Sequence, residues 1–186
     1  MTPEEYLAWE REEPYKHQYI GGEVFAMSGG KPRHNVLGAN TTAVLFNALR
    51  GTGCRALSSD QKVYCAATGD YVYPDVTVVC GPIELRAGTT DVILNPRIVV
   101  EVLSKSTDAH DRGGKWEDYR QIPTLTDYLL VSQRVARVEH FARQTDGAWL
   151  LRVIESGQEV HLTTGAVLLV DELFTGAFEV PGDDDG

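Results

Sequence analysis

Two apolar stretches, each carrying one carboxylate, constrain the fold of this chain most. Residues 73–79 read Tyr-Pro-Asp-Val-Thr-Val-Val, and residues 98–103 read Ile-Val-Val-Glu-Val-Leu. Such β-branched runs predict buried strands, and a lone acid inside one is costly to desolvate unless it is paired or binds a cation. If the two strands are neighbours, Asp75 and Glu101 meet at one end of a sheet. There they would supply two oxygen ligands of the kind that a divalent metal prefers.

Each of these acids also has a simpler explanation. Asp75 could cap a neighbouring loop at the end of its strand. Glu101 could form a buried salt bridge with Arg97 or Lys115. It is the stronger signal of the two acids, because three apolar residues precede it and two follow it. Taken together, the two acids favour a shared cation.

A helix expected over about residues 108–121 adds a third group. Asp111, Lys115 and Tyr119 are spaced four residues apart, which places them on one helix face. On the protein surface this would be an ordinary Asp–Lys pair. If the face points toward the two acids, Lys115 could orient an attacking water or stabilise charge on a phosphate. The pair Gly113–Gly114 just before Lys115 weakens the helix at that point.

A second helix, expected over residues 32–49, begins with basic residues. Lys31, Arg33 and His34 lie at its N-terminus, where the helix dipole favours an anion such as a backbone phosphate. The alternative is a helix start that simply faces solvent. Glu23, in a Gly-Gly hairpin, is either a further metal ligand or an exposed turn acid, and the turn position favours the second explanation.

The rest of the pattern predicts the order of the elements. A short helix is expected from Pro3 to about Arg11, followed by a hairpin over 19–27. One or two strands are expected over 54–64, a strand that holds Asp75 over 71–80, a loop over 81–97 and a strand over 98–103. Ser106 or Thr107 is expected to be the N-cap of the helix that follows. A C-terminal β-meander is expected from strands over 126–132, 135–143, 149–155 and about 166–170. The chain has no internal repeat or linker, so residues 1–186 are expected to form a single α/β (α+β) domain with a mixed sheet. The acidic tail from about residue 180 is expected to be disordered.

Composition limits the classes of protein. A length of 186 residues suits one domain, and 42% hydrophobic and 24% charged residues are ordinary for a globular protein. No apolar run is long enough for a membrane span, and the N-terminus lacks the basic and apolar regions of a signal peptide. We therefore expect a cytoplasmic protein with no membrane partner. The widely spaced Cys54, Cys65 and Cys80 are expected to be buried reduced thiols.

The net charge of −10 argues against a protein that coats nucleic acid. The excess is terminal, however. Residues 171–186 hold six acids and no Lys or Arg, and residues 14–170 are neutral, with 16 acids and 16 bases. A local basic groove therefore remains open in the body of the chain. No GxSxG, HExxH or P-loop motif offers a competing catalytic set.

Several short motifs together resemble one known family. They are Tyr19–Val24, Pro32-Arg33-His34, Tyr73–Val76, Val99–Ser104, Ser106-Thr107, Asp111–Lys115 and Tyr119. Their order and spacing resemble the Uma-type restriction endonuclease family, within the PD-(D/E)xK nuclease superfamily. The resemblance spans roughly residues 3–175 and implies a restriction-endonuclease-like core, with a mixed central β-sheet flanked by helices.

The resemblance also implies a site and a reaction. Asp75 and Glu101 would bind Mg²⁺ or Mn²⁺ for the hydrolysis of DNA phosphodiester bonds, and RNA stays open as a substrate. The superfamily pattern has a lysine two positions after the second acid, where this chain has Leu103. Lys115 is the natural replacement, and Lys105 ranks second.

Further roles follow from the same resemblance. Tyr119 would position Lys115 or a phosphate oxygen, while Arg33, His34, Lys105 and Arg112 would contact the nucleic-acid backbone. Cutting both DNA strands needs two sites, which a homodimer would supply.

Two departures from the family pattern support alternative functions. Gln18 and Gly21 stand in the hairpin where the pattern has acids. These changes favour a catalytically silent DNA-binding or regulatory module that keeps the nuclease fold. A third interpretation is a structural or protein-interaction domain with a buried Glu101–Lys115 pair and no metal.

Overall fold

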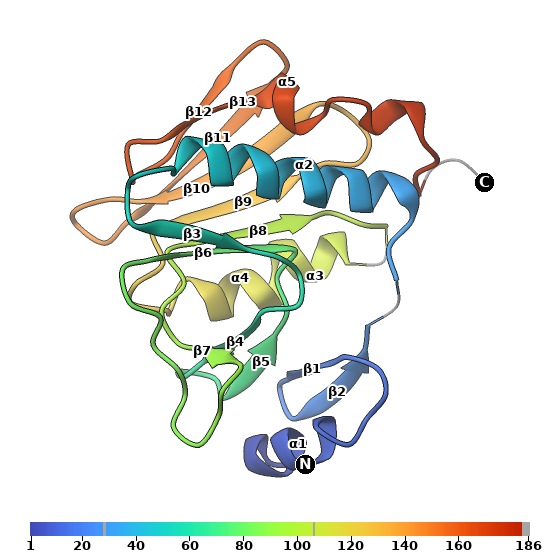
Figure 1. Cartoon of the computed structure of the whole chain (residues 1–186), viewed down its shortest axis with the longest axis vertical. Helices are drawn as coiled ribbons and strands as arrows, with labels where there is room; N and C mark the ends of the chain where they lie inside the picture. Colours follow the sequence, from blue (N-terminus) through green and yellow to red (C-terminus); the bar gives the residue numbers. More distant parts are fainter. Residues whose placement is uncertain (28, 106, 184–186) are drawn as a thin grey trace.

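A computed structural model describes residues 1–27, 29–105 and 107–183 of the chain (Figure 1). Its centre is a six-stranded sheet in the order β11-β10-β9-β8-β6-β3. The strands are β3 (Cys54–Leu57), β6 (Val76–Cys80), β8 (Ile98–Val102), β9 (Asp127–Val131), β10 (Arg137–Arg143) and β11 (Trp149–Glu155). Strands β8 and β9 are parallel and the other neighbours are antiparallel. The predicted mixed sheet is therefore confirmed.

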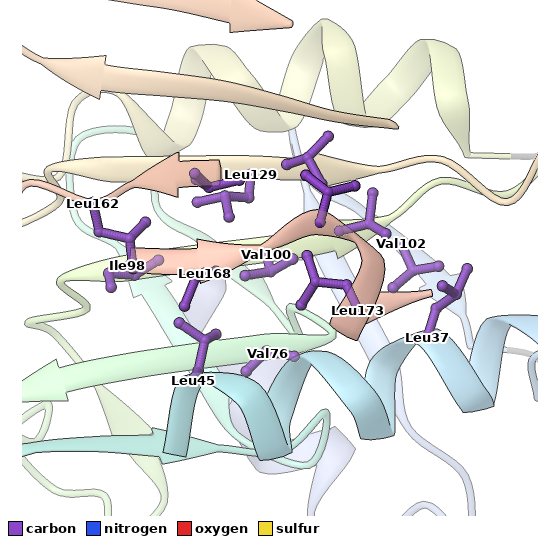
Figure 2. Packing of buried hydrophobic residues seen from close by; sticks show 14 of the residues in the cluster. Leu37, Leu45, Val76, Ile98, Val100, Val102, Leu129, Leu162, Leu168 and Leu173 are labelled. Atoms are coloured by element: carbon purple, nitrogen blue, oxygen red, sulfur yellow. The ribbon is translucent and has the colours of Figure 1, made fainter. Parts of the chain in front are cut away.

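Helices cover both faces of this sheet (Figure 1). Helix α2 (Pro32–Ala48) lies on one face, where Leu37 and Leu45 pack toward Val76 and Val100 (Figure 2). Helices α3 (Asp108–Arg112) and α4 (Gly114–Tyr119) lie on the other face. No helix within the described residues is long and apolar enough to cross a membrane.

The alternation of β8 decides which residues meet which helix. Val100 and Val102 point into the core under α2, whereas Val99 and Leu103 pack with Tyr119 on the α4 side. Because successive side chains of a strand point to opposite faces, Glu101 lies on the same side as Val99 and Leu103. A carboxylate is thereby directed at helix α4.

A second, five-stranded sheet lies beside α1 (Pro3–Glu10) in the order β2-β1-β5-β4-β7. Its strands are β1 (His17–Ile20), β2 (Glu23–Ala26), β4 (Lys62–Cys65), β5 (Asp70–Val72) and β7 (Val92–Ile93). Tyr6 of α1 packs between Tyr19 and Tyr71 of this sheet, with ring centroids 5.2 Å away in both cases. Thr2 and Glu5 form a capping box that begins α1, as Pro3 predicted.

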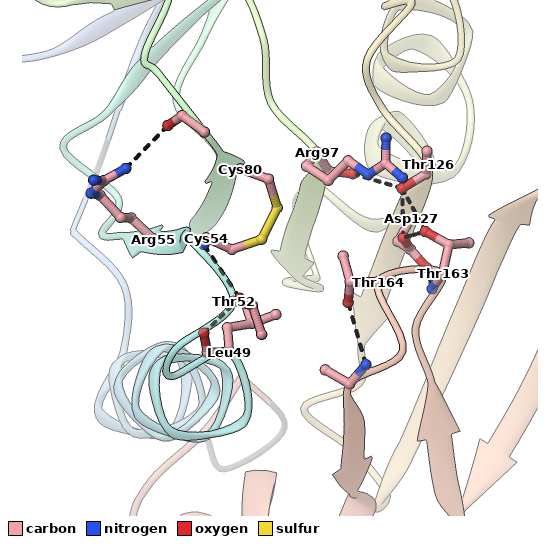
Figure 3. Close-up of a disulfide and its surroundings, with 12 residues drawn as sticks. Leu49, Thr52, Cys54, Arg55, Cys80, Arg97, Thr126, Asp127, Thr163 and Thr164 are labelled. Carbon is pink, nitrogen blue, oxygen red and sulfur yellow. Dashed lines mark hydrogen bonds between the residues drawn. A yellow bond between two sulfur atoms is a disulfide. The ribbon is translucent and has the colours of Figure 1, made fainter.

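The C-terminal part adds a hairpin and two short helical turns over the α2 face. They are β12 (Glu159–His161), β13 (Val167–Leu169), α5 (Val170–Leu173) and the 3₁₀ turn η1 (Ala177–Glu179). Asp127 at the start of β9 ties the hairpin to the main sheet. Its buried carboxylate accepts the backbone N–H of Thr163 at 3.0 Å and contacts Nε2 of His140 at 2.8 Å, and Thr126 lies alongside (Figure 3).

Two predicted elements are divided. The strand expected over 71–80 is two strands, β5 and β6, that belong to different sheets. Pro74 lies between them and has no N–H for a ladder, so Asp75 precedes β6 rather than lying within a strand. The helix expected over 108–121 breaks at Gly113, whose φ and ψ are −111° and −91°.

Other boundaries differ less. Strand β7, which lies within the loop expected over 81–97, was not predicted, nor were strand β12, helix α5 and the turn η1. Thr107 is the residue before α3, although its side chain bonds Ser104 rather than capping the helix. Ser106, the alternative cap, and residues 184–186 of the acidic tail lie outside the described residues.

The prediction of three reduced thiols is wrong for two of them. Cys54 and Cys80 form a disulfide (Figure 3), because they lie directly opposite each other in the β3–β6 pair. Sequence spacing does not reveal that register. Cys65 is the buried free cysteine among the described residues, as expected.

Candidate active site

Strand pairing brings the two acids of the opening motif together. Strands β6 and β8 are antiparallel neighbours with Val76 opposite Val100, so Asp75 and Glu101 are the next residues along the two chains. Oδ2 of Asp75 accepts the backbone N–H of Val102 at 2.7 Å. This bond fixes the Asp75 carboxylate against the end of β8.

Glu101 is held by the helix that covers it. The residue is only 3% exposed, and its Oε1 accepts hydrogen bonds from Nζ of Lys115 at 3.0 Å and from the hydroxyl of Tyr119 at 2.7 Å. Of the two cations considered as partners for Glu101, the structure therefore shows Lys115. The i,i+4 spacing of Lys115 and Tyr119 on α4 is what lets both reach one oxygen.

Lys115 is shared between two buried acids. Its ammonium lies 3.0 Å from Oε1 of Glu101 and 3.0 Å from Oδ1 of Asp111, and Asp111 is 1% exposed. Burial alone would lower the pKa of Lys115, but the charges of Glu101 and Asp111 hold that pKa above its usual range. Lys115 is thus a cation at neutral pH rather than a base.

Glu101 lies in surroundings that disfavour its charge. The pKa of Glu101 is raised to about 8, mainly by burial. The positive charge of Lys115 lowers this pKa, and the negative charges of Asp111 and Asp75 raise it. The hydrogen bond from Tyr119 also lowers it. A carboxylate in this state gains stability from an additional cation nearby.

His34 joins the site from the first turn of α2. Its Nε2 lies 3.4 Å from Oδ2 of Asp75. Burial lowers the pKa of His34, but the hydrogen bond to Asp75 and the charges of Asp75, Glu101 and Asp183 raise it overall. His34 also packs tightly on Gly30, where an added Cβ would lie 2.7 Å from Nδ1 of the ring.

The two acids fit the ligand set of a divalent cation. Within the described residues, the hydrogen bonds to Glu101 all reach Oε1, and the polar contacts of Asp75 all reach Oδ2. Oε2 of Glu101 and Oδ1 of Asp75 thus have no donor among those residues. Mg²⁺ is commonly held by one or two carboxylates, with waters and substrate phosphates completing its shell.

Glu23 does not join this pair. It is exposed at the start of β2, and the described part of the chain contains no group of three or more His, Cys, Asp and Glu side chains that could hold a metal. Its position supports the turn-acid explanation.

The residues predicted to bind nucleic acid divide into two kinds. His34 lies beside Asp75. Lys105 is exposed and follows strand β8, four residues after Glu101. Arg33 is buried and donates to the carbonyls of Ala177, Gln133 and Val180. Arg112 pairs with acidic residues on α3 and β10.

Sequence reasoning missed one residue of the centre. Asp111 was treated as half of an ordinary surface pair, whereas it is buried against Lys115. The signal was available in the spacing, because Asp111, Lys115 and Tyr119 share a helix face and the last two were assigned to the site.

Comparison with known proteins identifies the family. The family described as "Uma2: Putative restriction endonuclease" matches residues 3–173. The chain belongs to this family. The resemblance inferred from the motifs is thereby confirmed.

Relatives and a solved structure agree with the Uma2 assignment. Two proteins of Synechocystis sp. (strain ATCC 27184 / PCC 6803 / Kazusa) are similar to this chain. "Uncharacterized protein slr1290" is 38% identical, covering 95% of this chain and 92% of the relative. "Uncharacterized protein sll1609" is 33% identical, and the match covers 81% of this chain and 85% of the relative.

The structural match is with a crystal structure titled as a putative nuclease belonging to DUF820 from Anabaena variabilis ATCC 29413. It has a TM-score of 0.76 and 15% sequence identity and covers 95% of this chain and 99% of that one. At this identity the match shows the fold, and it confirms the fold class expected for the Uma2 chain.

Proposed function

We propose that this chain is an endonuclease that hydrolyses DNA phosphodiester bonds with Mg²⁺ or Mn²⁺ held by Asp75 and Glu101. The observation that carries the proposal is the buried Glu101, held on one oxygen by Lys115 and Tyr119 and lying next to Asp75. Each acid keeps one oxygen without a donor among the described residues. Membership of a family described as restriction endonucleases supports the same reaction class.

The chain's own residues have distinct roles in this proposal. Asp75 and Glu101 bind the cation, and the chemistry supplied by that cation when bound is a polarised phosphate and a lower pKa for a bound water. Lys115 stays protonated and stabilises the negative charge that develops on the phosphate. Tyr119 fixes the Glu101 carboxylate and so keeps Lys115 in place. His34, also at the sheet end, contacts the DNA backbone.

The test combines cleavage with metal binding. Nicking of supercoiled plasmid in Mg²⁺ or Mn²⁺ is expected to fall about 100-fold or more in Glu101→Gln and Lys115→Ala. Arg152→Ala is the control, because it removes an exposed cation on β11 that has no role in the proposed site, and it should stay within a few-fold of the wild type. Lys105→Ala is measured beside it as the alternative lysine. Calorimetry should show Mn²⁺ binding to the wild type and its loss in Asp75→Asn and Glu101→Gln. Circular dichroism confirms that each variant is folded.

Two results would contradict the assignment. Wild-type rates of nicking in a folded Glu101→Gln variant would remove Glu101 from the chemistry. Loss of nicking in Lys105→Ala but not in Lys115→Ala would move the lysine role to Lys105.

One observation favours a second candidate, a catalytically silent DNA-binding or regulatory module. The ammonium of Lys115 already neutralises Glu101 and Asp111 in a closed, buried ion group, and Gln18 and Gly21 replace acids of the family pattern. In that case DNA binding would persist at low salt without nicking or metal binding. If neither DNA nor metal binds, the structural or protein-interaction domain is the explanation.

A further inference from the structure

The C-terminal residues of the chain lie across the start of α2 (Figure 1). The Arg33 guanidinium donates to the carbonyls of Ala177 at 3.3 Å and Val180 at 3.1 Å, and its backbone N–H donates to Pro181 at 3.0 Å. Nζ of Lys31 donates to the carbonyl of Gly182 at 3.2 Å. The first part of this segment is therefore anchored on a buried arginine, and the last described part lies over a lysine.

Asp183 ends this segment beside the candidate active site. Its Oδ2 accepts the backbone N–H of Lys105 at 2.9 Å and Nε2 of Gln133 at 3.3 Å. Gln133 is 4% exposed and also donates to the carbonyl of Leu103. The carboxylate thus lies at the turn that leaves β8, four residues after Glu101.

The donors around Asp183 suit a phosphate. Backbone N–H groups, amide side chains and lysine ammonium groups make most protein contacts to the DNA backbone, and Lys31, Lys105 and Gln133 present all three kinds here. The oxygen of Asp183 accepts the same hydrogen bonds that a phosphate oxygen would accept. In the sequence Asp184 and Asp185 follow directly, and residues 171–186 hold six acids and no Lys or Arg.

We propose that Asp183 competes with the DNA backbone for the surface formed by Lys31, Lys105 and Gln133. The C-terminal end then acts as an autoinhibitory contact of the nuclease. A segment attached to the same chain acts at an effective concentration near the millimolar range, so even a weak contact of Asp183 with these donors competes with non-specific DNA binding. The inference rests on the proposed function, because it requires that DNA reach this site.

The contacts of Arg33 that anchor the segment are separate from the contacts of Asp183. Arg33 binds residues up to Val180 and Pro181, so a chain that ends at Pro181 keeps these bonds and loses the acidic end. Gly182 offers a change without altered charge, because a Cβ there would lie 2.5 Å from Nη1 of Arg33. Gly182→Ala should therefore displace the neighbouring Asp183 from its donors.

The experiment measures binding of a labelled mixed-sequence DNA duplex by fluorescence anisotropy in EDTA, so that cleavage does not interfere. Truncation after Pro181 and the Asp183→Asn/Asp184→Asn/Asp185→Asn variant are each expected to bind about tenfold more tightly than the full chain at low salt. Gly182→Ala should shift affinity in the same direction. The gain should shrink as salt screens the contacts.

The control separates local competition from overall charge. Glu12→Gln/Glu84→Gln/Glu172→Gln removes three exposed acids elsewhere and should change affinity less than about twofold. The triple Asn variant keeps the full chain length, so it remains informative if the truncated chain does not fold.

Each other outcome overturns the proposal in a distinguishable way. Equal affinity of the full chain and the Asn variant, with clear DNA binding by both, rejects the competition and leaves the nuclease assignment standing. An equal gain in the control variant reduces the effect to overall charge. Absence of DNA binding by every variant rejects both the competition and the proposed function.

Discussion

Among single residues, the candidate site is centred on the ammonium of Lys115, which lies between the buried carboxylates of Glu101 and Asp111. Lys115 lies 3.0 Å from both Glu101 and Asp111, and all three side chains are almost completely buried. Because ions that have been removed from water must be compensated inside the protein, the loss of one partner costs more than the intact group contributes to stability. In the proposed function, a metal and Lys115 would act on one carboxylate.

Replacement of Lys115 by methionine tests this electrostatic balance. Lys115→Met leaves Glu101 and Asp111 facing each other without a cation, so we expect the free energy of unfolding to fall by about 3–5 kcal/mol at pH 8. The loss should be smaller at pH 5.5, since the raised pKa of Glu101 lets this buried carboxyl be protonated there, and Mn²⁺ should restore part of it. Urea denaturation at the two pH values measures the effect.

Lys105→Met provides the comparison for that measurement. Lys105 is exposed, and its replacement should change stability by less than about 0.5 kcal/mol. A loss below about 1 kcal/mol in Lys115→Met would mean that the buried acids do not need this cation.

A glycine sets the position of His34. An added Cβ at Gly30 would lie 2.7 Å from Nδ1 and 2.9 Å from Cγ of the His34 ring. Gly30→Ala should therefore displace the ring from Asp75 and weaken DNA binding several-fold in an anisotropy titration. Gly29→Ala is the matched control, because nothing lies within 4 Å of a Cβ there. Equal affinities of the two variants would show that DNA does not use His34.

At the scale of elements, the break between α3 and α4 places the site. Gly113 leaves helical geometry, so Asp111 lies on α3, while Lys115 and Tyr119 lie on a separate helix, α4. Gly113–Gly114 signalled the weakness in the sequence, but propensity alone does not say whether a helix bends or tolerates its glycines.

The acid pair and the helix face were predictable from local patterns, and the register was not. The β-branched runs around Asp75 and Glu101 predicted buried strands, and the four-residue spacing predicted that Lys115 and Tyr119 lie on one helix face. Strand pairing depends on contacts between distant residues. The division of 71–80 between two sheets therefore could not be derived from local patterns, whereas the burial of Asp111 could have been inferred from the helix face that it shares with Lys115.

The pairing of Cys54 with Cys80 shows the same limit and gives a direct test. The disulfide joins β3 to β6 across 26 positions of sequence, so its reduction should lower the free energy of unfolding by about 2–4 kcal/mol. Thiol titration of the denatured, unreduced chain should find one free thiol, that of Cys65, and reduction should reveal all three. Three free thiols without reductant would contradict the disulfide, and a Cys54→Ser/Cys80→Ser variant should not respond to reductant.

At the scale of the whole molecule, a pair of acids connects the two sheets. Asp118 on α4 interacts with Asp70 of β5, whose charge and hydrogen-bonding carboxyl raise the pKa of Asp118, and Oδ1 of Asp70 accepts the backbone N–H of Gly21 at the β1–β2 turn, at 2.9 Å. Helix α4, which carries Lys115 and Tyr119, is thereby tied to the smaller sheet. Two carboxyls can share such a hydrogen bond only while one of them is protonated.

The connection between the sheets should therefore weaken as pH rises. Burial, the charge of Asp70 and the hydrogen bond to Asp70 together raise the pKa of Asp118 from 3.8 to about 7. The folded state thus holds a proton that the unfolded chain releases between about pH 4 and 7, so the contribution of Asp118 to stability is fully present below about pH 4 and declines through that interval. Asp118→Asn imitates the protonated acid and removes this contribution. Urea denaturation should show the variant gaining roughly 2 kcal/mol over the wild type between pH 5 and 8. Glu101, whose pKa is also raised, stays in both chains, so the difference between them isolates Asp118. A difference that does not change with pH would mean that the two sheets are held together independently of this proton.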